Sequence, residues 1–230
     1  MANHITDKAR SAVAIMAKAP LPGEVKTRLC PPLSLGAAAQ LYQCFLLDKI
    51  AQVNDLQRAT PVVSYSPSDS RSIFEALVPV HFLLIPQRGD DLGARILWTF
   101  EQLFGQGYTQ VLVIDSDTPT LPVAYLDRAL MLIAEGENDV VLGPTEDGGY
   151  YLIGLRQSYP ALFERMPWST PEVFTETRRR SAQFGLTVTC TEYWYDVDTP
   201  DDLTRLAVSL AQTQNGWARH TRQFLREFQR

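Results

Sequence analysis

The chain has 230 residues, 45% of them hydrophobic, which suits the core of one α/β domain. With 21 Lys and Arg against 26 Asp and Glu, its net charge of −5 argues against a nucleic-acid partner. The first ten residues are polar and no apolar run approaches membrane-spanning length, so we expect a cytoplasmic protein without a membrane partner. The cysteines Cys30, Cys44 and Cys190 are too unevenly spaced to predict a disulfide or zinc site.

Apolar runs of strand length alternate with amphipathic helical patterns through the first half of the chain. The predicted strands cover 11–17, 60–66, 81–85 and 110–115, and the predicted helices cover 34–53, 68–77, 92–104 and 123–134. This alternation is typical of βαβ units with right-handed crossovers. It predicts a mainly parallel sheet with helices on both faces, that is, a three-layer α/β/α fold.

After residue 134 the pattern changes. Residues 139–155 hold two apolar strands joined through Asp-Gly-Gly, which favours a hairpin and therefore a mixed sheet. Residues 202–230 predict two helices with a break at Asn215-Gly216. One side of the second helix should carry Trp217, Thr221, Phe224, Leu225 and Phe228. We expect this helix to dock on the domain; its exposed face offers a possible homodimer contact.

Two pairs of aspartates follow predicted strands. Asp115 and Asp117 lie where the apolar strand 110–115 stops, and Asp196 and Asp198 repeat the spacing after the aromatic segment 193–195, taken here as a strand. Residues two apart share one face of an extended chain, and ligands bind at the carboxyl ends of strands in open α/β sheets. Carboxylate oxygens there suit a divalent cation such as Mg²⁺ or Mn²⁺. The alternative for the second pair is purely structural, because Thr199 and Pro200 predict a capped helix start.

The loop after the first strand, "AKAPLPGEVKTRL", is stiff and cationic. Lys26 and Arg28 lie two apart and can point together toward bound phosphate, while Pro20, Pro22 and Gly23 shape the backbone. Beside a divalent cation, such side chains would neutralise charge on a leaving phosphate. The alternative is a solvated loop.

Four motifs, "AKAPLPGEVKTRL", "IDSDTPTLP", "GPTEDGGYYLIGL" and "YDVDTPDDL", resemble a family of bacterial glycosyltransferase-like proteins associated with arsenosugar clusters. That family belongs to the nucleotide-diphospho-sugar transferase superfamily and is similar to 2-phospho-lactate and molybdenum cofactor guanylyltransferases. The resemblance spans about residues 11–206 and implies one domain over residues 1–230 with a GT-A-like fold and C-terminal helices in 201–230. The loop has only Gly23 where nucleotidyltransferases carry several glycines, which favours a diphospho-sugar donor.

The resemblance also implies roles for individual residues. The metal ligands would be Asp115, Asp117, Asp196 and Asp198, and the catalytic groups Asp117, Asp198, Lys26 and Arg28. The implied nucleotide or substrate contacts are Ala17, Lys18, Pro22, Gly23, Lys26, Arg28, Gln87, Asp90, Gly93, Arg95, Asp115, Asp147, Gly148 and Gly149. For two groups a structural reading competes, since Asp90 or Asp91 can cap a helix and Asp147, Gly148 and Gly149 can form a plain turn.

The sequence therefore predicts a metal-dependent transferase that moves the sugar of a nucleotide-diphospho-sugar to a small-molecule acceptor. The first alternative is a nucleotidyltransferase that uses an NTP and releases pyrophosphate. The second is a nucleotide-binding module without catalysis. Thr170 and Pro171 predict a further helix start, and Trp168 before them can either stack on a ligand or pack in the core.

Overall fold

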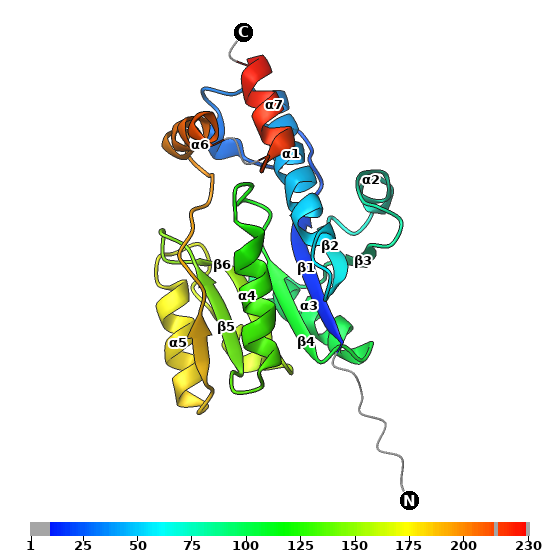
Figure 1. The fold of residues 1–230 in the computed structure, drawn as a ribbon, viewed down its shortest axis with the longest axis vertical. Coiled ribbons are helices and arrows are strands. Elements are labelled where there is room, and N and C mark those ends of the chain that lie inside the picture. Colours follow the sequence, from blue (N-terminus) through cyan, green and yellow to red (C-terminus); the bar gives the residue numbers. More distant parts are fainter. Residues whose placement is uncertain (1–9, 214–215, 229–230) are drawn as a thin grey trace, which may run out of the picture.

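The computed structural model describes residues 10–213 and 216–228, so the predicted break at Asn215 lies partly outside the described residues. One sheet of seven strands runs through the molecule (Figure 1). Its strands are β1 (Ser11–Lys18), β2 (Thr60–Ser66), β3 (Leu83–Pro86), β4 (Gln110–Ile114), β5 (Val140–Pro144), β6 (Tyr150–Leu155) and β7 (Val188–Cys190). The α-helices are α1 (Leu35–Asn54), α2 (Arg71–Leu77), α3 (Leu92–Gly105), α4 (Val123–Ala134), α5 (Val173–Gln183), α6 (Pro200–Gln212) and α7 (Arg219–Phe228). Two short 3₁₀ helices are η1 (Thr27–Leu29) and η2 (Pro160–Leu162).

The strand order is β3-β2-β1-β4-β6-β5-β7. Strands β1, β2, β3 and β4 are parallel, and β5 and β7 are also parallel to each other. Only β6 runs antiparallel to its neighbours β4 and β5, because the turn at 145–149 sends the chain straight back. The predicted mostly parallel mixed sheet and the predicted hairpin are both confirmed.

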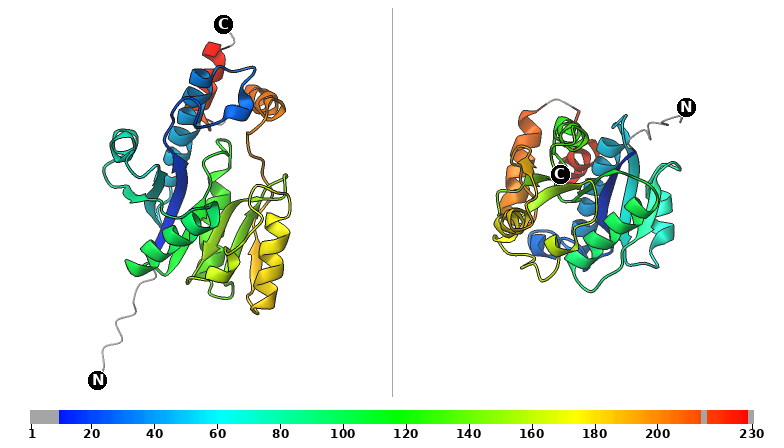
Figure 2. Two further views of the ribbon diagram at one scale, coloured as in Figure 1. Left: turned by 180° about the vertical axis from the view of Figure 1, so that it is seen from behind. Right: turned by 90° about the horizontal axis from the view of Figure 1, so that it is seen from below.

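Side chains of successive strand residues pack against opposite helix layers. On β1, Val13 and Ile15 belong to the core shared with α1, α4 and α6, whereas Ala12 and Ala14 belong to the core shared with α3. Leu112 and Val113 on β4 separate in the same way, as the period of two along a strand requires. The end-on view in Figure 2 shows helices on both sides of the sheet. The three-layer α/β/α architecture is thus confirmed.

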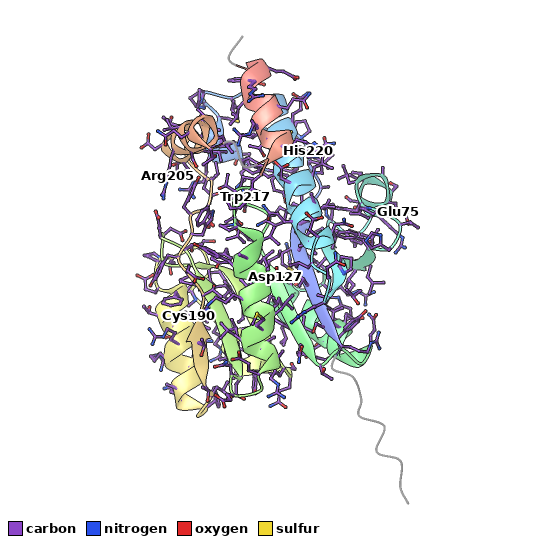
Figure 3. All side chains as sticks on the ribbon, viewed as in Figure 1. Glu75, Asp127, Cys190, Arg205, Trp217 and His220 are labelled. Atoms are coloured by element: carbon purple, nitrogen blue, oxygen red, sulfur yellow. The ribbon has the colours of Figure 1, made fainter. Side chains whose placement is uncertain are left out.

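The C-terminal helix α7 lies alongside α1 (Figure 1). The carboxylate of Asp48, which is buried on α1, accepts hydrogen bonds at 2.9 Å from the backbone N–H groups of both His220 and Thr221 at the start of α7. His220 marks this end of the helix in Figure 3. A carboxylate at a helix N-terminus satisfies unpaired donors and complements the helix dipole. Of the residues predicted to face inward, Thr221 and Leu225 are buried, while Trp217 and Phe228 are substantially exposed.

Two local predictions were wrong. Helix α5 begins at Val173 with Glu172 as its N-cap, and not at Pro171. The Thr170 hydroxyl donates to the Pro167 carbonyl at 2.8 Å and so stabilises the preceding turn. The aromatic segment 193–195 is not a strand either: only Trp194 forms a bridge, with Thr145, because β5 ends at Pro144 and leaves no longer partner.

Helix α6 begins as predicted, with Thr199 as N-cap and Pro200 in the first turn. Thr199 and Asp202 form a capping box, in which the Thr199 hydroxyl accepts from the Asp202 backbone N–H and the Asp202 carboxylate accepts from the Thr199 N–H. The same carboxylate accepts from the Asp198 N–H at 3.1 Å. The cap therefore also fixes the backbone of a predicted site residue.

Thr199→Ala is expected to lower the free energy of unfolding by about 1 kcal/mol, because one N-terminal donor of α6 loses its acceptor. Urea unfolding followed by circular dichroism measures this loss. Thr204→Ala, an exposed threonine on the same helix, is the matched control and should change stability by less than about 0.5 kcal/mol. Equal losses in the two variants would contradict a capping role.

In the described part of the chain, no helix is both long enough and apolar enough to cross a membrane.

Candidate functional site

The Lys26 ammonium lies between one aspartate of each predicted pair. Its Nζ is 2.5 Å from Asp117 Oδ1 and 2.8 Å from Asp198 Oδ1. The Lys26 side chain is only 5% exposed, whereas Arg28, whose Nη1 is 3.8 Å from Asp198 Oδ2, is 72% exposed. Burial alone would lower the pKa of Lys26, but the charges of Asp117 and Asp198 outweigh it and raise that pKa above its ordinary value. Both predicted cations therefore meet the predicted carboxylates.

Segments far apart in sequence meet at this point because of the sheet order. Residue 115 follows β4, and its backbone N–H donates to the Tyr151 carbonyl on the neighbouring strand β6. The Asp117 carbonyl accepts a hydrogen bond at 3.1 Å from the N–H of Val197. This bond holds the segment before α6 against the exit of β4, and so brings Asp196 and Asp198 to the same edge of the sheet as Asp115 and Asp117.

Deeper in the site, Asp115 pairs with a fully buried lysine, Lys49 of α1. Lys49 Nζ lies 3.6 Å from Asp115 Oδ1 and donates to the carbonyl and hydroxyl oxygens of Thr118 at 2.9 and 2.6 Å. The Thr118 hydroxyl in turn donates to Asp115 Oδ1 at 2.7 Å. Burial raises the pKa of Asp115 to about 6, although the charge of Lys49 opposes that rise. Burial lowers the pKa of Lys49 itself.

Two carboxylate oxygens in the cluster are buried and have no hydrogen-bond partner: Asp115 Oδ2 and Asp196 Oδ1. Burial, followed by the charges of Asp115 and Asp117, raises the pKa of Asp196 well above its usual range. Buried anionic oxygens are costly unless a donor or cation compensates them. Carboxylate oxygens are the type of ligand that a hard divalent cation prefers.

Within residues 10–213 and 216–228, no three acidic, histidine or cysteine side chains are arranged closely enough to hold a metal ion. The position between Asp117 and Asp198, where the sequence predicts a cation, is held by the Lys26 ammonium.

Our sequence reasoning missed the support that α1 gives to the loop after β4. The Tyr42 hydroxyl exchanges a hydrogen bond with Ser116 Oγ at 2.9 Å and accepts another from the Lys18 N–H. About two turns further along the same helix face, the Lys49 ammonium donates to the Thr118 carbonyl, and Gln52 Nε2 donates to the Pro119 carbonyl. The available signal was a set of polar residues at helical spacing on the buried side of an otherwise apolar helix.

A cavity of about 580 Å³ opens at the carboxyl ends of β1, β2 and β3. It is lined by Lys18, Ala19, Leu21, Glu24, Ser66, Pro67, Ser68, Gln87, Gly89 and Arg95. Gln87 Nε2 donates to the backbone carbonyls of Ala17 and Ser64 at 3.3 and 2.7 Å, which fixes the orientation of its amide. Three predicted nucleotide contacts, Lys18, Gln87 and Arg95, thus line one cavity. The backbone carbonyl of Ala17, a fourth predicted contact, accepts one of the Gln87 hydrogen bonds.

Other predicted contacts have structural positions. Asp90 is exposed, and its neighbour Asp91 caps α3 by accepting from the Ala94 N–H at 2.7 Å. A Cβ on Gly93 would lie 2.6 Å from Trp168 Nε1, so Gly93 allows close packing of Trp168. Trp168 also meets the Tyr150 ring edge-on, and so packs within the protein. Pro22 and Gly23 are exposed in the cationic loop, where Gly23 adopts φ +84°.

The turn between β5 and β6 is built by Asp147, Gly148 and Gly149. Asp147 Oδ1 accepts from the Thr145 hydroxyl at 2.6 Å and from the Gly149 N–H at 3.1 Å. Gly148 has φ +92°, and a Cβ there would lie 2.2 Å from the Pro171 carbonyl oxygen, so only glycine fits. These contacts explain the turn without a ligand, although the charge of Asp147 is one of those that raise the pKa of Asp196.

The fold is that of the nucleotide-diphospho-sugar transferase class. The profile of a family described as "Uncharacterized protein conserved in bacteria (DUF2064)" matches residues 49–170, and the chain belongs to this family. It is similar to a crystal structure from Desulfovibrio desulfuricans G20 that is provisionally assigned as a nucleotide-diphospho-sugar transferase. The identity is 31%, the TM-score is 0.87, and the match covers 95% of each chain.

More distant structures share the fold alone. The synthetase of CMP-2-keto-3-deoxy-manno-octonic acid, complexed with CTP, has 14% identity and a TM-score of 0.58, over 89% of this chain and 99% of that one. The 4-diphosphocytidyl-2C-methyl-D-erythritol synthase of Anaerococcus prevotii DSM 20548 has 12% identity and a TM-score of 0.57, over 88% and 97%. A search of curated proteins finds no match.

Proposed function

We propose that the protein is a metal-dependent transferase that binds a nucleotide-diphospho-sugar and transfers the sugar to a small-molecule acceptor. The observation that carries this proposal is the meeting of Lys26, Asp117 and Asp198 at the edge of the sheet where β1 and β4 end. Lys18, at the end of β1, lines a cavity that Gln87 and Arg95 also line. Two carboxylates and an ammonium at the same edge of the sheet as a cavity of this size suit a ligand with a nucleoside and a diphosphate.

Asp117 and Asp198, with Asp115 and Asp196, are the residues that would hold Mg²⁺ or Mn²⁺. The buried unpartnered oxygens of Asp115 and Asp196 support this assignment, because they lack the compensation that a cation gives. When bound, the cation would supply charge neutralisation to the diphosphate leaving group.

The chain's own cations would share this work. Lys26 and Arg28 would stabilise the negative charge that grows on the leaving nucleotide, and Lys18 and Arg95 would hold the nucleotide in the cavity. Positioning and electrostatic stabilisation of this kind can carry a transfer without a covalent intermediate.

Nucleotidyl transfer from an NTP, with release of pyrophosphate, is the second candidate. It is favoured by the fold shared with cytidylyltransferases, one of them complexed with CTP. The family that the four motifs resemble is itself similar to guanylyltransferases, which points the same way. Against it stands the single glycine, Gly23, in a loop that would have to wrap a triphosphate.

A thermal-shift panel distinguishes these functions. The ligands are UDP, GDP, ADP, CDP and dTDP sugars and the corresponding NTPs, each with Mg²⁺, Mn²⁺ or EDTA. A ligand at a hundredfold its dissociation constant should add about 2.7 kcal/mol of stability. We expect a metal-dependent shift with one nucleotide sugar. A shift with an NTP alone, with pyrophosphate release, would establish the second candidate, and no shift with any ligand would contradict both.

A further inference from the structure

The Lys26 ammonium forms ion pairs with two carboxylates that are themselves candidates for metal binding. Its Nζ lies within 2.8 Å of one oxygen from each of Asp117 and Asp198. These carboxylates are 36% and 39% exposed, whereas the lysine side chain is 5% exposed. Lys26 is therefore the buried member of the cluster, and its two partners remain open to solutes.

The backbone of Lys26 has an unusual conformation. Its φ is +49°, in the left-handed region that residues other than glycine rarely adopt, and it immediately precedes η1. Its ammonium lies 5.7 Å from the centre of the Phe45 ring, on α1. Such a position persists only when its surroundings compensate for it, and the two ion pairs provide that compensation.

A divalent cation that bridged the same two oxygens would need the position that this ammonium occupies. Mg²⁺ binds carboxylate oxygens at about 2.0–2.1 Å and larger divalent ions at up to about 2.6 Å, whereas Lys26 Nζ lies 2.5 and 2.8 Å from the two oxygens, so a cation bridging them would overlap the ammonium. A metal bridging Asp117 and Asp198 would consequently meet a like charge at contact distance in a partly buried site.

We propose that Lys26 is a tethered counter-ion that competes with the divalent cation for Asp117 and Asp198. The free protein then binds metal weakly, because the ammonium must first break its ion pairs with Asp117 and Asp198. The diphosphate of a nucleotide offers Lys26 a second anionic partner, so nucleotide and metal should strengthen each other's binding by the same factor. This inference rests on the proposed function and adds a coupling to it: metal and nucleotide bind cooperatively.

The direct test is Mn²⁺ binding to the full-length protein without nucleotide, measured by loss of the electron paramagnetic resonance signal of free Mn²⁺. Lys26→Met keeps the length of the side chain and removes the ammonium. It should bind Mn²⁺ at least about tenfold more tightly than the wild type. Arg71→Met removes an equal charge from an exposed position on α2, where Arg71 pairs with Glu75, and should change the affinity less than about threefold.

A second measurement needs no variant and so does not depend on whether Lys26→Met folds. The unmodified protein is acetylated with an amine-reactive ester, and labelling is read at each lysine by mass spectrometry. Saturating Mn²⁺ should increase acetylation of Lys26 severalfold and leave that of the exposed Lys18 unchanged.

The outcomes distinguish failure of the Lys26 competition from failure of the proposed function. Mn²⁺ affinity no higher in Lys26→Met than in the wild type, or Lys26 labelling unchanged at Mn²⁺ concentrations that bind, overturns the competition but leaves the proposed function standing. Failure of both proteins to bind Mn²⁺, together with a nucleotide panel in which metal has no effect, overturns both.

Discussion

Asp117→Asn is expected to weaken metal-dependent nucleotide binding about 100-fold, which corresponds to ~2.7 kcal/mol. The amide keeps the size of the carboxylate but loses the charge that holds Lys26 in the structure and, in our proposal, the cation. An amide oxygen is a weaker ligand for a hard cation, and the variant retains the backbone bond from Val197 to the Asp117 carbonyl, so the fold should persist. Calorimetric titration of the nucleotide selected by the ligand panel, with Mn²⁺ and with EDTA, measures the effect.

The matched control for this variant is Asp127→Asn. Asp127 is exposed on α4 (Figure 3). Its substitution removes the same charge without changing a residue of the aspartate pairs. Its metal-dependent affinity should stay within about twofold of the wild type, because exposed charges at a distance are screened by salt. Unchanged affinity in Asp117→Asn would remove Asp117 from the metal-binding set.

Lys49→Met is expected to lower the free energy of unfolding by about 3 kcal/mol, a large share of the stability of an ordinary domain. Lys49 is fully buried, and its ammonium satisfies two Thr118 oxygens and pairs with Asp115. Methionine fills a similar volume but leaves Asp115 buried without its counter-charge. Urea unfolding followed by circular dichroism measures the loss.

A double-mutant cycle separates charge from packing in this prediction. In Lys49→Met combined with Asp115→Asn both charges are gone, and most of the loss should be recovered. Lys18→Met, which removes an exposed lysine, should cost less than about 0.5 kcal/mol. If the double variant is as unstable as the sum of its single variants, Lys49 acts through packing and its Thr118 contacts, and the ion pair contributes little.

The fold was largely predictable because its determinants are local. The hairpin of β5 and β6 follows from Asp-Gly-Gly, since Gly148 must adopt a positive φ and leave room for Pro171. The alternation of inward and outward residues on β1 and β4 follows from strand geometry. The start of α5 was misjudged by two residues, because the Thr170 hydroxyl donates to the Pro167 carbonyl and accepts from the Glu172 N–H, and so orders a turn that precedes the helix.

The sequence could indicate which residues belong to the candidate site, but not which of them contact one another. Asp115, Asp117, Asp196 and Asp198 can be picked out because each pair follows an apolar or aromatic segment. The bond between Lys26 and Asp198 joins residues 172 positions apart, and no local pattern specifies such a pairing. Lys49 escaped notice for a related reason: a lysine in a helix ordinarily faces water, and only the packing of α1 under the β4 loop buries it.

The order of the strands also bears on how this protein behaves at high concentration. The two edges of the sheet are β3, with four residues ending in Pro86, and β7, with three residues. Unpaired N–H and C=O groups on long edge strands are templates for intermolecular pairing and aggregation. Here the eight-residue strand β1 is enclosed by β2 and β4, and only short segments, one of them ending in a proline without an N–H, face outward. The sheet is therefore poorly suited to grow by adding strands from a second molecule.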